Sequence, residues 1–216
     1  MNYKVAIFDM DGTILDTLID LKNSVNFALK EHGFPQRTYD EVRMFVGNGM
    51  PKLIERAVPA GTDEKTLQKV FGDFTENYRE HCMDNTCPYH GIIDLLKNLK
   101  KRGIKLAVIS NKADFAVQDL CSRFFPGIFD AVYGERPDIR RKPAPDAVNE
   151  VLQSLKVEKS AAVYIGDSEV DVETAKNAGL DLISVLWGFR EKENLISCGA
   201  KNFAANMEEL ENLITA

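Results

Sequence analysis

The chain has 216 residues, of which 44% are hydrophobic and 28% charged, and its formal net charge at pH 7 is −6. This composition excludes a disordered polymer and allows a sizeable core, in one large domain or in a domain with an inserted unit. The acidic balance argues against a nucleic-acid partner, because phosphate backbones attract basic surfaces. No apolar run is long enough for a bilayer span or a secretory signal. We therefore expect a cytoplasmic protein without a membrane partner, whose four cysteines are reduced.

The first predicted element is a short apolar strand, residues 3–8, and the chain then becomes helical. Apolar residues recur at helical spacing through residues 14–86, with one interruption at the glycines of VGNG, so this stretch is interpreted as all-helical. The helices expected there are one from residue 18 that ends at Gly33, two short ones within 39–58, and one around 67–78.

From residue 88 onwards the pattern changes to alternating helices and strands. The helices expected there are 92–102, 113–124, 145–155, 171–178 and 207–214, and the strands are 104–109, 129–134, 161–166 and 180–186. Such alternation is typical of a parallel sheet covered by helices on both faces. The predicted fold class is therefore α/β: a Rossmann-like, three-layer core of residues 1–13 and 88–216, with a small all-helical unit, residues 14–87, inserted after the first strand.

Chemically reactive side chains follow several of the predicted strands. Ligands of open parallel sheets bind at the carboxyl ends of the strands, so we expect these side chains to lie close together. They are Asp9 and Asp11 after the first strand, Ser110 and Asn111 after the second, Lys142 further on, and Asp167 and Asp171 after the strand 161–166.

This set of side chains suits chemistry at phosphorus. Clustered carboxylates repel one another unless a hard divalent cation such as Mg²⁺, which prefers oxygen ligands, lies between them. A hydroxyl group, an amine and helix N-termini suit a phosphoryl group. A carboxylate with Mg²⁺ and phosphate indicates attack by aspartate at phosphorus, which gives an aspartyl-phosphate.

Four segments of the chain, in this order, resemble the motifs of the haloacid dehalogenase superfamily of phosphohydrolases. They are DMDGTILD from Asp9, VISNK ending at Lys112, KPAPD from Lys142, and GDSEVDVETAKNAG from Gly166. The helical insert is similar to the small helical cap of one subclass. Within that subclass, MFVGNGMPKLIERAV in the insert and LWGF after the strand 180–186 resemble the phosphoglycolate phosphatases.

The resemblance implies roles for the matching residues. Asp9 would be the nucleophile, and Asp11 would protonate the leaving oxygen and then activate water; the dehalogenating members lack an acid at the Asp11 position. Mg²⁺ would be held by the carboxylates of Asp9 and Asp167 and by the main-chain carbonyl of Asp11. Asp171 would orient metal-bound water or the lysine. The phosphoryl oxygens would be bound by Ser110, Asn111 and Lys142. The implied protein is a Mg²⁺-dependent phosphatase, monomeric or homodimeric, that acts on a small phosphorylated metabolite, with phosphoglycolate the leading candidate.

The loop of Gly47, Asn48 and Gly49 is a candidate substrate-binding segment, because the resemblance places such a loop over the active site. Arg43, Asn48 and Lys52 lie near it in sequence and are candidates to meet a substrate carboxylate. The alternative is a plain turn between two helices.

Structural explanations compete with the functional ones at several positions. Ser110 and Asn111 are favoured residues for capping the helix 113–124. Ser168 and Asp171 have the spacing of a capping box, with Asp in place of the usual Glu. Lys142 is one of three consecutive cations, and only the KPAPD pattern selects it over Arg140 and Arg141.

The segment HCMDNTCPYH, residues 81–90, contains His81, Cys82, Cys87 and His90, a set that invites a zinc interpretation. Its spacing does not match the usual paired structural-zinc patterns. We interpret it instead as the return linker from the insert to the core.

Three other functions share parts of this pattern. A phosphosugar mutase of the same fold would return the phosphoryl group to a second hydroxyl, and the motifs do not exclude it. A signalling receiver domain also has acids, Ser or Thr and Lys around Mg²⁺, but it is shorter and lacks a helical insert. A catalytically inactive binding protein would be expected to lack some of the catalytic residues, all of which are present.

Overall fold

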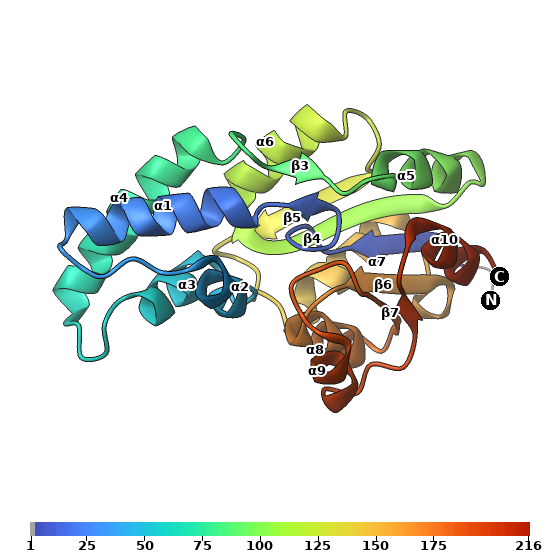
Figure 1. Ribbon diagram of the computed structural model, residues 1–216. Coiled ribbons are helices and arrows are strands. Elements are labelled where there is room, and N and C mark those ends of the chain that lie inside the picture. Colours follow the sequence, from blue (N-terminus) through green and yellow to red (C-terminus); the bar gives the residue numbers. More distant parts are fainter. Residues whose placement is uncertain (1–2) are drawn as a thin grey trace.

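The computed structural model describes residues 3–216, and its centre is a parallel sheet (Figure 1). In the described residues this sheet has six strands in the order β5-β4-β1-β6-β7-β8, and each neighbouring pair is parallel. The strands are β1 Val5–Phe8, β4 Lys105–Ala113, β5 Ala131–Glu135, β6 Ala162–Gly166, β7 Asp181–Val185 and β8 Phe203–Ala204. The predicted α/β class is confirmed; the first two residues of the predicted segment 1–13 lie outside the described residues.

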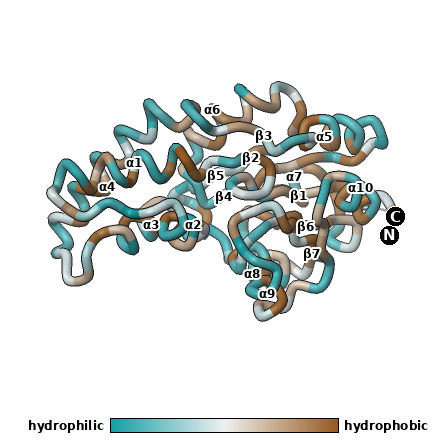
Figure 2. The backbone as a smooth tube through the Cα atoms, in the orientation of Figure 1, coloured by the Kyte–Doolittle hydropathy of each residue, from teal (hydrophilic) through white to brown (hydrophobic). Residues whose placement is uncertain are grey.

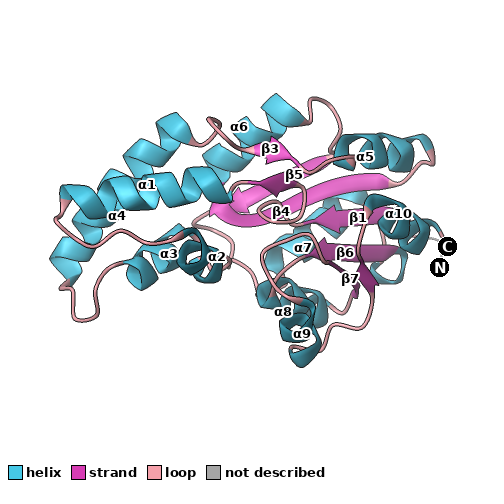
Figure 3. Ribbon diagram, in the orientation of Figure 1, coloured by secondary structure: helices cyan, strands magenta, loops and turns pink. Residues whose placement is uncertain are grey.

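Helices cover both faces of the sheet, which gives three layers (Figure 3). The helices on one face are α5 Ile92–Lys101, α6 Asp114–Phe124 and α10 Met207–Thr215. Those on the other face are α7 Asp146–Leu155 and α8 Glu169–Ala178, and the short α9 Lys192–Ser197 packs against α8. Successive side chains of a strand point to opposite faces. Thus Phe8 of β1 packs against the helices of the first face and Ile7 against those of the second, and both side chains are fully buried.

Four helices form a separate unit between β1 and α5, at the left of Figure 1. They are α1 Leu18–Glu31, α2 Tyr39–Phe45, α3 Met50–Ala57 and α4 Glu64–His81. Figure 2 shows hydrophobic and hydrophilic stretches alternating along them, as expected for helices that bury one side. Their buried side chains form a cluster of their own, to which the core contributes Phe189.

The junction between the two units corrects one expectation. Residues 14–86 are not entirely helical, because β2 Leu15–Asp16 pairs antiparallel with β3 Cys87–Pro88. Ile14 and Leu15 pack in the core of the sheet, so the proposed limit 14 lies one residue before this two-stranded ribbon and the limit 87 lies within it. A two-residue strand such as β2, β3 or β8 is too short to leave a periodic pattern, and the six-residue α9 is less than two helical turns long.

Candidate active site

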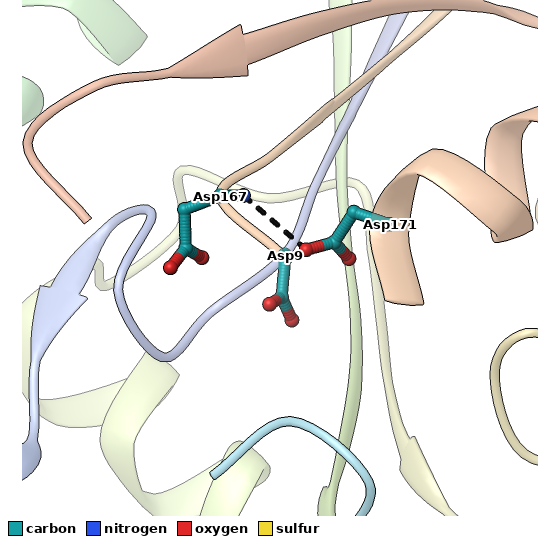
Figure 4. Close-up of side chains that lie close together, drawn as sticks. All are labelled: Asp9, Asp167 and Asp171. Carbon is teal, nitrogen blue, oxygen red and sulfur yellow. Dashed lines mark hydrogen bonds between the residues drawn. The ribbon is translucent and has the colours of Figure 1, made fainter. Parts of the chain in front are cut away.

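The carboxyl ends of three neighbouring strands bring the predicted acids and hydroxyl together. Asp9 directly follows β1, Asp167 follows β6, and Ser110 lies in the last residues of β4. Because β4, β1 and β6 are adjacent and parallel, these side chains reach the same edge of the sheet. Carboxylate oxygens of Asp9, Asp167 and Asp171 lie within 4.8 Å of one another, and Figure 4 shows the three side chains side by side.

Asp171 is held by hydrogen bonds at the start of α8. Its Oδ2 atom accepts from the main-chain nitrogens of Asp167 and Ser168 at 3.2 and 3.1 Å, and from Ser168 Oγ at 2.6 Å. This is the capping box that the sequence predicts. The Oδ1 atom accepts from Lys142 Nζ at 2.8 Å. Asp171 is therefore fully engaged in fixing the helix and the lysine, which leaves Asp9 and Asp167 as the more available carboxylates.

Lys142 is the cation that reaches the acids. Its side chain is 3% exposed, and Nζ lies 2.8 Å from both Asp9 Oδ1 and Asp171 Oδ1. Arg140 is 78% exposed and pairs with Asp146, while Arg141 lies 3.7 Å from Glu135. The structure thus separates the three consecutive cations as the KPAPD pattern predicted.

The cluster carries more negative than positive charge, and the pKa values reflect this. Burial raises the pKa of Asp9 well above its usual value, and the charges of Asp171 and Asp167 add to this shift, which Lys142 opposes. Burial and the charge of Asp171 raise the pKa of Asp167 to about 7, although hydrogen bonds from Phe189 N and Thr13 Oγ1 oppose the shift. Burial lowers the pKa of Lys142, but the adjacent carboxylates outweigh it and the net shift is upward. One ammonium group therefore does not balance the acids.

This surplus of carboxylate oxygens fits a hard divalent cation such as Mg²⁺. Asp9 uses only Oδ1 for Lys142, which leaves Oδ2 for a ligand. Asp167 accepts from Thr13 Oγ1 at 2.9 Å and from Phe189 N at 2.8 Å, so its orientation is fixed. Gly12 lies against it with φ +85°, and a Cβ there would collide with the Asp167 carboxylate. The residues present thus suit the expected ion.

Asp11 has a partner that the sequence analysis did not include in the site. Lys112 Nζ lies 2.8 and 3.1 Å from the two Asp11 oxygens, and Thr17 Oγ1 donates to Oδ1 at 2.6 Å. The Lys112 side chain is 2% exposed, and Nζ lies 4.8 Å from the centroid of the Tyr78 ring on α4. Burial alone would lower the pKa of Lys112, but Asp11 reverses the effect and raises it. The sequence contained an indication of a functional role for Lys112, since it is the last residue of the motif VISNK.

Ser110 and Asn111 do not cap α6. That helix has Ala113 at its N-cap position without a side-chain hydrogen bond, and β4 extends through both residues. Ser110 and Asn111 face the pocket. Both amide hydrogens of Asn111 are used, however, because Nδ2 donates to the Gly47 carbonyl at 3.2 Å and to the Lys142 carbonyl at 3.0 Å. Asn111 thus ties the loop of the insert to the core, and its contact with a phosphoryl group stays a prediction.

A pocket of ≈ 540 Å³, counting its open mouth, lies over these groups. The side chains that the insert contributes to its wall are all apolar, and the glycine loop adds backbone. The insert residues in the wall are Leu21, Val46, Gly47, Gly49, Met50 and Leu53.

The structure does not favour the expected contact of Arg43, Asn48 and Lys52 with substrate. None of the three lines the pocket. Arg43 donates to the Phe189 carbonyl at 2.6 Å, Asn48 Oδ1 accepts from Arg56 at 2.7 Å, and Lys52 pairs with Glu55 on the surface. Proximity in sequence failed here because Arg43 and Lys52 are on helices, which turn successive side chains to different sides, and Asn48 of the loop between them contacts Arg56.

Arg190 is a second cation that the sequence analysis missed. It is buried, pairs with Glu169 through Nε at 2.7 Å, and donates to the main-chain carbonyls of Arg43 and Val46 at 2.8 and 2.7 Å. These bonds tie the core to the insert beside the pocket. No short motif marks Arg190, because its partners are distant in sequence.

The segment 81–90 runs along the junction, as its interpretation as a return linker predicted. Cys82 is buried in the core of the insert, and Cys87 belongs to β3. His81 Nδ1 lies 2.8 Å from Asp84 Oδ2. Tyr89 packs against Trp187 of the core, with ring centroids 6.4 Å apart.

Comparison with known proteins assigns the family. The model of the haloacid dehalogenase-like hydrolases matches residues 6–185. The chain belongs to this family. The phosphoglycolate phosphatase of Pseudomonas syringae pv. tomato is 32% identical over 98% of this chain and 78% of its own length, and that of Aquifex aeolicus is 31% identical over 86% of both. Among solved structures, a candidate phosphoglycolate phosphatase from Lactobacillus delbrueckii subsp. bulgaricus has 39% identity, covers 100% of both chains and has a TM-score of 0.96. The resemblance seen in the motifs is confirmed, and the protein is an enzyme of a hydrolase family, similar to phosphatases over nearly its full length.

Proposed function

We propose that the protein is a Mg²⁺-dependent phosphatase that hydrolyses a small phosphomonoester through an aspartyl-phosphate on Asp9. The observation that carries this proposal is the convergence of Asp9, Asp167 and Lys142 at the sheet edge. Asp9 Oδ1 lies 2.8 Å from the ammonium group, and the Asp9 and Asp167 carboxylates lie within 4.8 Å of each other. An anionic nucleophile can approach an anionic phosphoryl group only where positive charge is fixed in advance.

In the first step, a carboxylate oxygen of Asp9 attacks phosphorus, the bond to the ester oxygen breaks, and Asp11 gives its proton to the departing oxygen. In the second step, Asp11 takes a proton from water, whose oxygen attacks the same phosphorus. The bond between Asp9 and phosphorus then breaks, and inorganic phosphate leaves. Asp11 lies two residues after Asp9, beyond the end of β1, where both side chains line the pocket.

Mg²⁺ would be held by the carboxylates of Asp9 and Asp167 and the main-chain carbonyl of Asp11, and it supplies positive charge between these acids and the phosphoryl oxygens. Lys142 provides fixed positive charge beside Asp9 and is kept in place by Asp171. Ser110 lines the same pocket and offers its hydroxyl to the phosphoryl group.

The leading substrate is phosphoglycolate, on which the relatives named above act by their names. The space that the surrounding side chains leave for a ligand inside the pocket is small, which supports a small ester. The insert, residues 14–87 as proposed, would act as a cap that closes over the substrate and excludes bulk water. A phosphosugar mutase would have to bind a polyol, and the apolar side chains of the insert offer it no side-chain hydrogen bonds.

A panel of small phosphate esters, assayed for phosphate release with and without Mg²⁺, tests the proposal. We expect turnover of phosphoglycolate that a chelator abolishes and Mg²⁺ restores. Fast conversion of a hexose phosphate into its isomer without phosphate release would contradict hydrolysis. Turnover of another small ester alone would change the substrate and leave the mechanism in place.

Partners and location are proposals of the same kind. Small phosphorylated metabolites are the expected partners, and monomer or homodimer is the expected state. Within residues 3–216 no helix is both long and apolar enough to traverse a bilayer. The cytoplasm stays the location expected from the sequence.

A further inference from the structure

We propose that Lys112 selects substrates by binding a negative charge, such as a carboxylate, on the leaving group. This inference rests on the proposed phosphatase function and names the substrate class of that site. Lys112 is an ammonium group in the pocket wall whose ion-pair partner is Asp11, the group assigned to protonate the ester oxygen.

The other cations in the pocket wall have different duties. Lys142 is paired with Asp9 and Asp171, at the end of the pocket where phosphorus must lie. Arg190 uses Nε, Nη1 and Nη2 for Glu169 and for two carbonyls of the insert. Among the described residues that line the pocket, Lys112 is therefore the cation placed to meet the leaving group.

Distance supports this assignment. Lys112 Nζ is 2.8 and 3.1 Å from the two oxygens of Asp11, so it lies next to the position of the ester oxygen that Asp11 protonates. The carboxyl carbon of a two-carbon leaving group is two covalent bonds, each roughly 1.5 Å, from that oxygen. A carboxylate on so short a leaving group comes within reach of the ammonium group, whereas one on a long leaving group passes beyond it.

The apolar wall around Lys112 makes its charge the main basis for choosing between leaving groups. The insert covers the leaving-group side with apolar side chains, among them Leu21, Met50 and Leu53. A carboxylate buried against such a wall without a cation would be strongly disfavoured, and a polyol would find no hydrogen-bonding side chain on the insert side to replace water. One ammonium group in an apolar wall therefore favours a small anionic leaving group over a neutral polar one.

The Tyr78 ring fixes the ammonium group from the insert side. Lys112 Nζ lies 4.8 Å from the centroid of this ring, which comes from α4 of the insert, while Lys112 itself belongs to β4 of the core. The attraction between a cation and an aromatic face, in a site shielded from water, keeps the ammonium group at the boundary of the two units. Arg43, Asn48 and Lys52 contact other groups, so the insert supplies shape and Lys112 supplies charge.

The test compares two substrates that differ in this charge: 2-phosphoglycolate and 2-hydroxyethyl phosphate, which has a neutral leaving group of similar size. Wild-type protein with Mg²⁺ should prefer phosphoglycolate by at least about ten-fold in kcat/KM, the scale of one charge-assisted contact. In Lys112→Met kcat/KM should fall for both esters, because Asp11 loses its ion-pair partner. It should fall further for phosphoglycolate, mainly through a higher KM, so that the preference vanishes. Lys112→Arg should keep part of the preference, and the exposed control Lys52→Met should keep all of it.

The outcomes separate this inference from the proposed function. Equal losses on both substrates in Lys112→Met would mean that Lys112 only positions Asp11, and would overturn the inference. So would a wild-type protein without preference, a result that needs no variant. If neither ester nor a generic phosphomonoester is hydrolysed, the phosphatase function itself fails.

Binding without turnover gives a second readout. In an Asp9→Asn background, calorimetry should show that Lys112→Met weakens binding of 2-phosphoglycolate by at least about ten-fold and leaves binding of inorganic phosphate unchanged. Equal weakening of both ligands would overturn the inference, because it would place Lys112 at the phosphoryl group.

Discussion

The two sides of the pocket are built on opposite principles. On the core side, Lys142 contacts both Asp9, just after a strand, and Asp171, at the start of a helix. On the insert side, apolar side chains such as Met50 and Leu53 face the same space, and polar groups of the insert are paired elsewhere. The core therefore provides the reacting charges, while the insert provides an apolar cover that strengthens their interactions by excluding water.

This difference predicts that substitutions on the two sides have different effects. Charged residues of the core should govern kcat and metal binding, whereas polar residues of the insert surface should affect neither.

The largest effect is expected at Asp9. Asp9→Asn should lower kcat for phosphoglycolate by about a thousand-fold or more, because the amide is not a nucleophile. Phosphate release measures it.

The fold of Asp9→Asn should be intact, since the change removes a charge from a crowded cluster. The control Asp94→Asn, on the exposed side of α5, should be fully active. An active Asp9→Asn protein would refute the nucleophile, provided that mass spectrometry excludes deamidation.

The next largest effect is expected at Lys142. Lys142→Met leaves Asp9 and Asp171 without the ammonium group that lies 2.8 Å from each. We expect a loss of about a hundred- to a thousand-fold in kcat/KM and a loss of about 3–5 kcal/mol of stability, the usual effect of breaking a buried pair. Activity assays and urea unfolding measure the two. Arg140→Met, which removes an exposed cation two residues earlier, should change neither; equal effects of the two substitutions would contradict the assignment.

An intermediate effect concerns metal and pH. In the folded protein without metal, the pKa of Asp167 is raised to about 7 from a usual value of 3.8. The folded state thus holds this proton more tightly than the unfolded state, so stability falls as the pH rises from about 4 to about 7. Mg²⁺ competes with the proton, so added Mg²⁺ should raise Tm by several degrees at pH 8 and by less at pH 5.5.

Differential scanning fluorimetry at the two pH values measures this shift. In Asp167→Asn the gain from Mg²⁺ should be lost at both. An equal gain in wild-type protein at pH 5.5 and pH 8 would show that the ion does not depend on Asp167.

The smallest effects are expected on the outer side of the insert. Asn48→Ala and Lys52→Ala should each change KM for phosphoglycolate by less than about two-fold, because their side chains contact Arg56 and Glu55 instead of the pocket. Leu53→Ala, on the same helix as Lys52 but in the pocket wall, should raise KM several-fold by opening the cover. Steady-state kinetics measures all three. A large change of KM in Lys52→Ala with no change in Leu53→Ala would contradict the view that the insert contacts substrate through its apolar side chains.

Most of the fold was predictable because the signals are local. The helix of residues 64–81 shows its apolar side as Val70, Phe74 and Tyr78 at helical spacing, and all three are fully buried. The strand β6 is a continuous apolar run covered on both faces. The short ribbon of β2 and β3 was not predictable, because pairing between Leu15 and Pro88 leaves no periodic pattern in either segment.

The part of the site that could be predicted consists of residues that directly follow strands of the sheet. Asp9 and Asp167 follow adjacent parallel strands, and the topology brings them together whatever their rotamers. Lys112 was visible as a motif residue, but its pairing with Asp11 joins positions that are 101 residues apart. Arg190 has no local signal at all.

The sequence by itself determined the alternation of strands and helices, the place of the insert, and which strand ends carry acids, because periodicity and chain order encode these directly. Only the tertiary structure decided which lysine meets which carboxylate, and that the insert faces the pocket with Leu21, Met50 and Leu53 rather than with Arg43 or Lys52. The physical reason is that side-chain contacts across the two units depend on how the helices rotate and pack against the sheet, which no short stretch of the chain specifies.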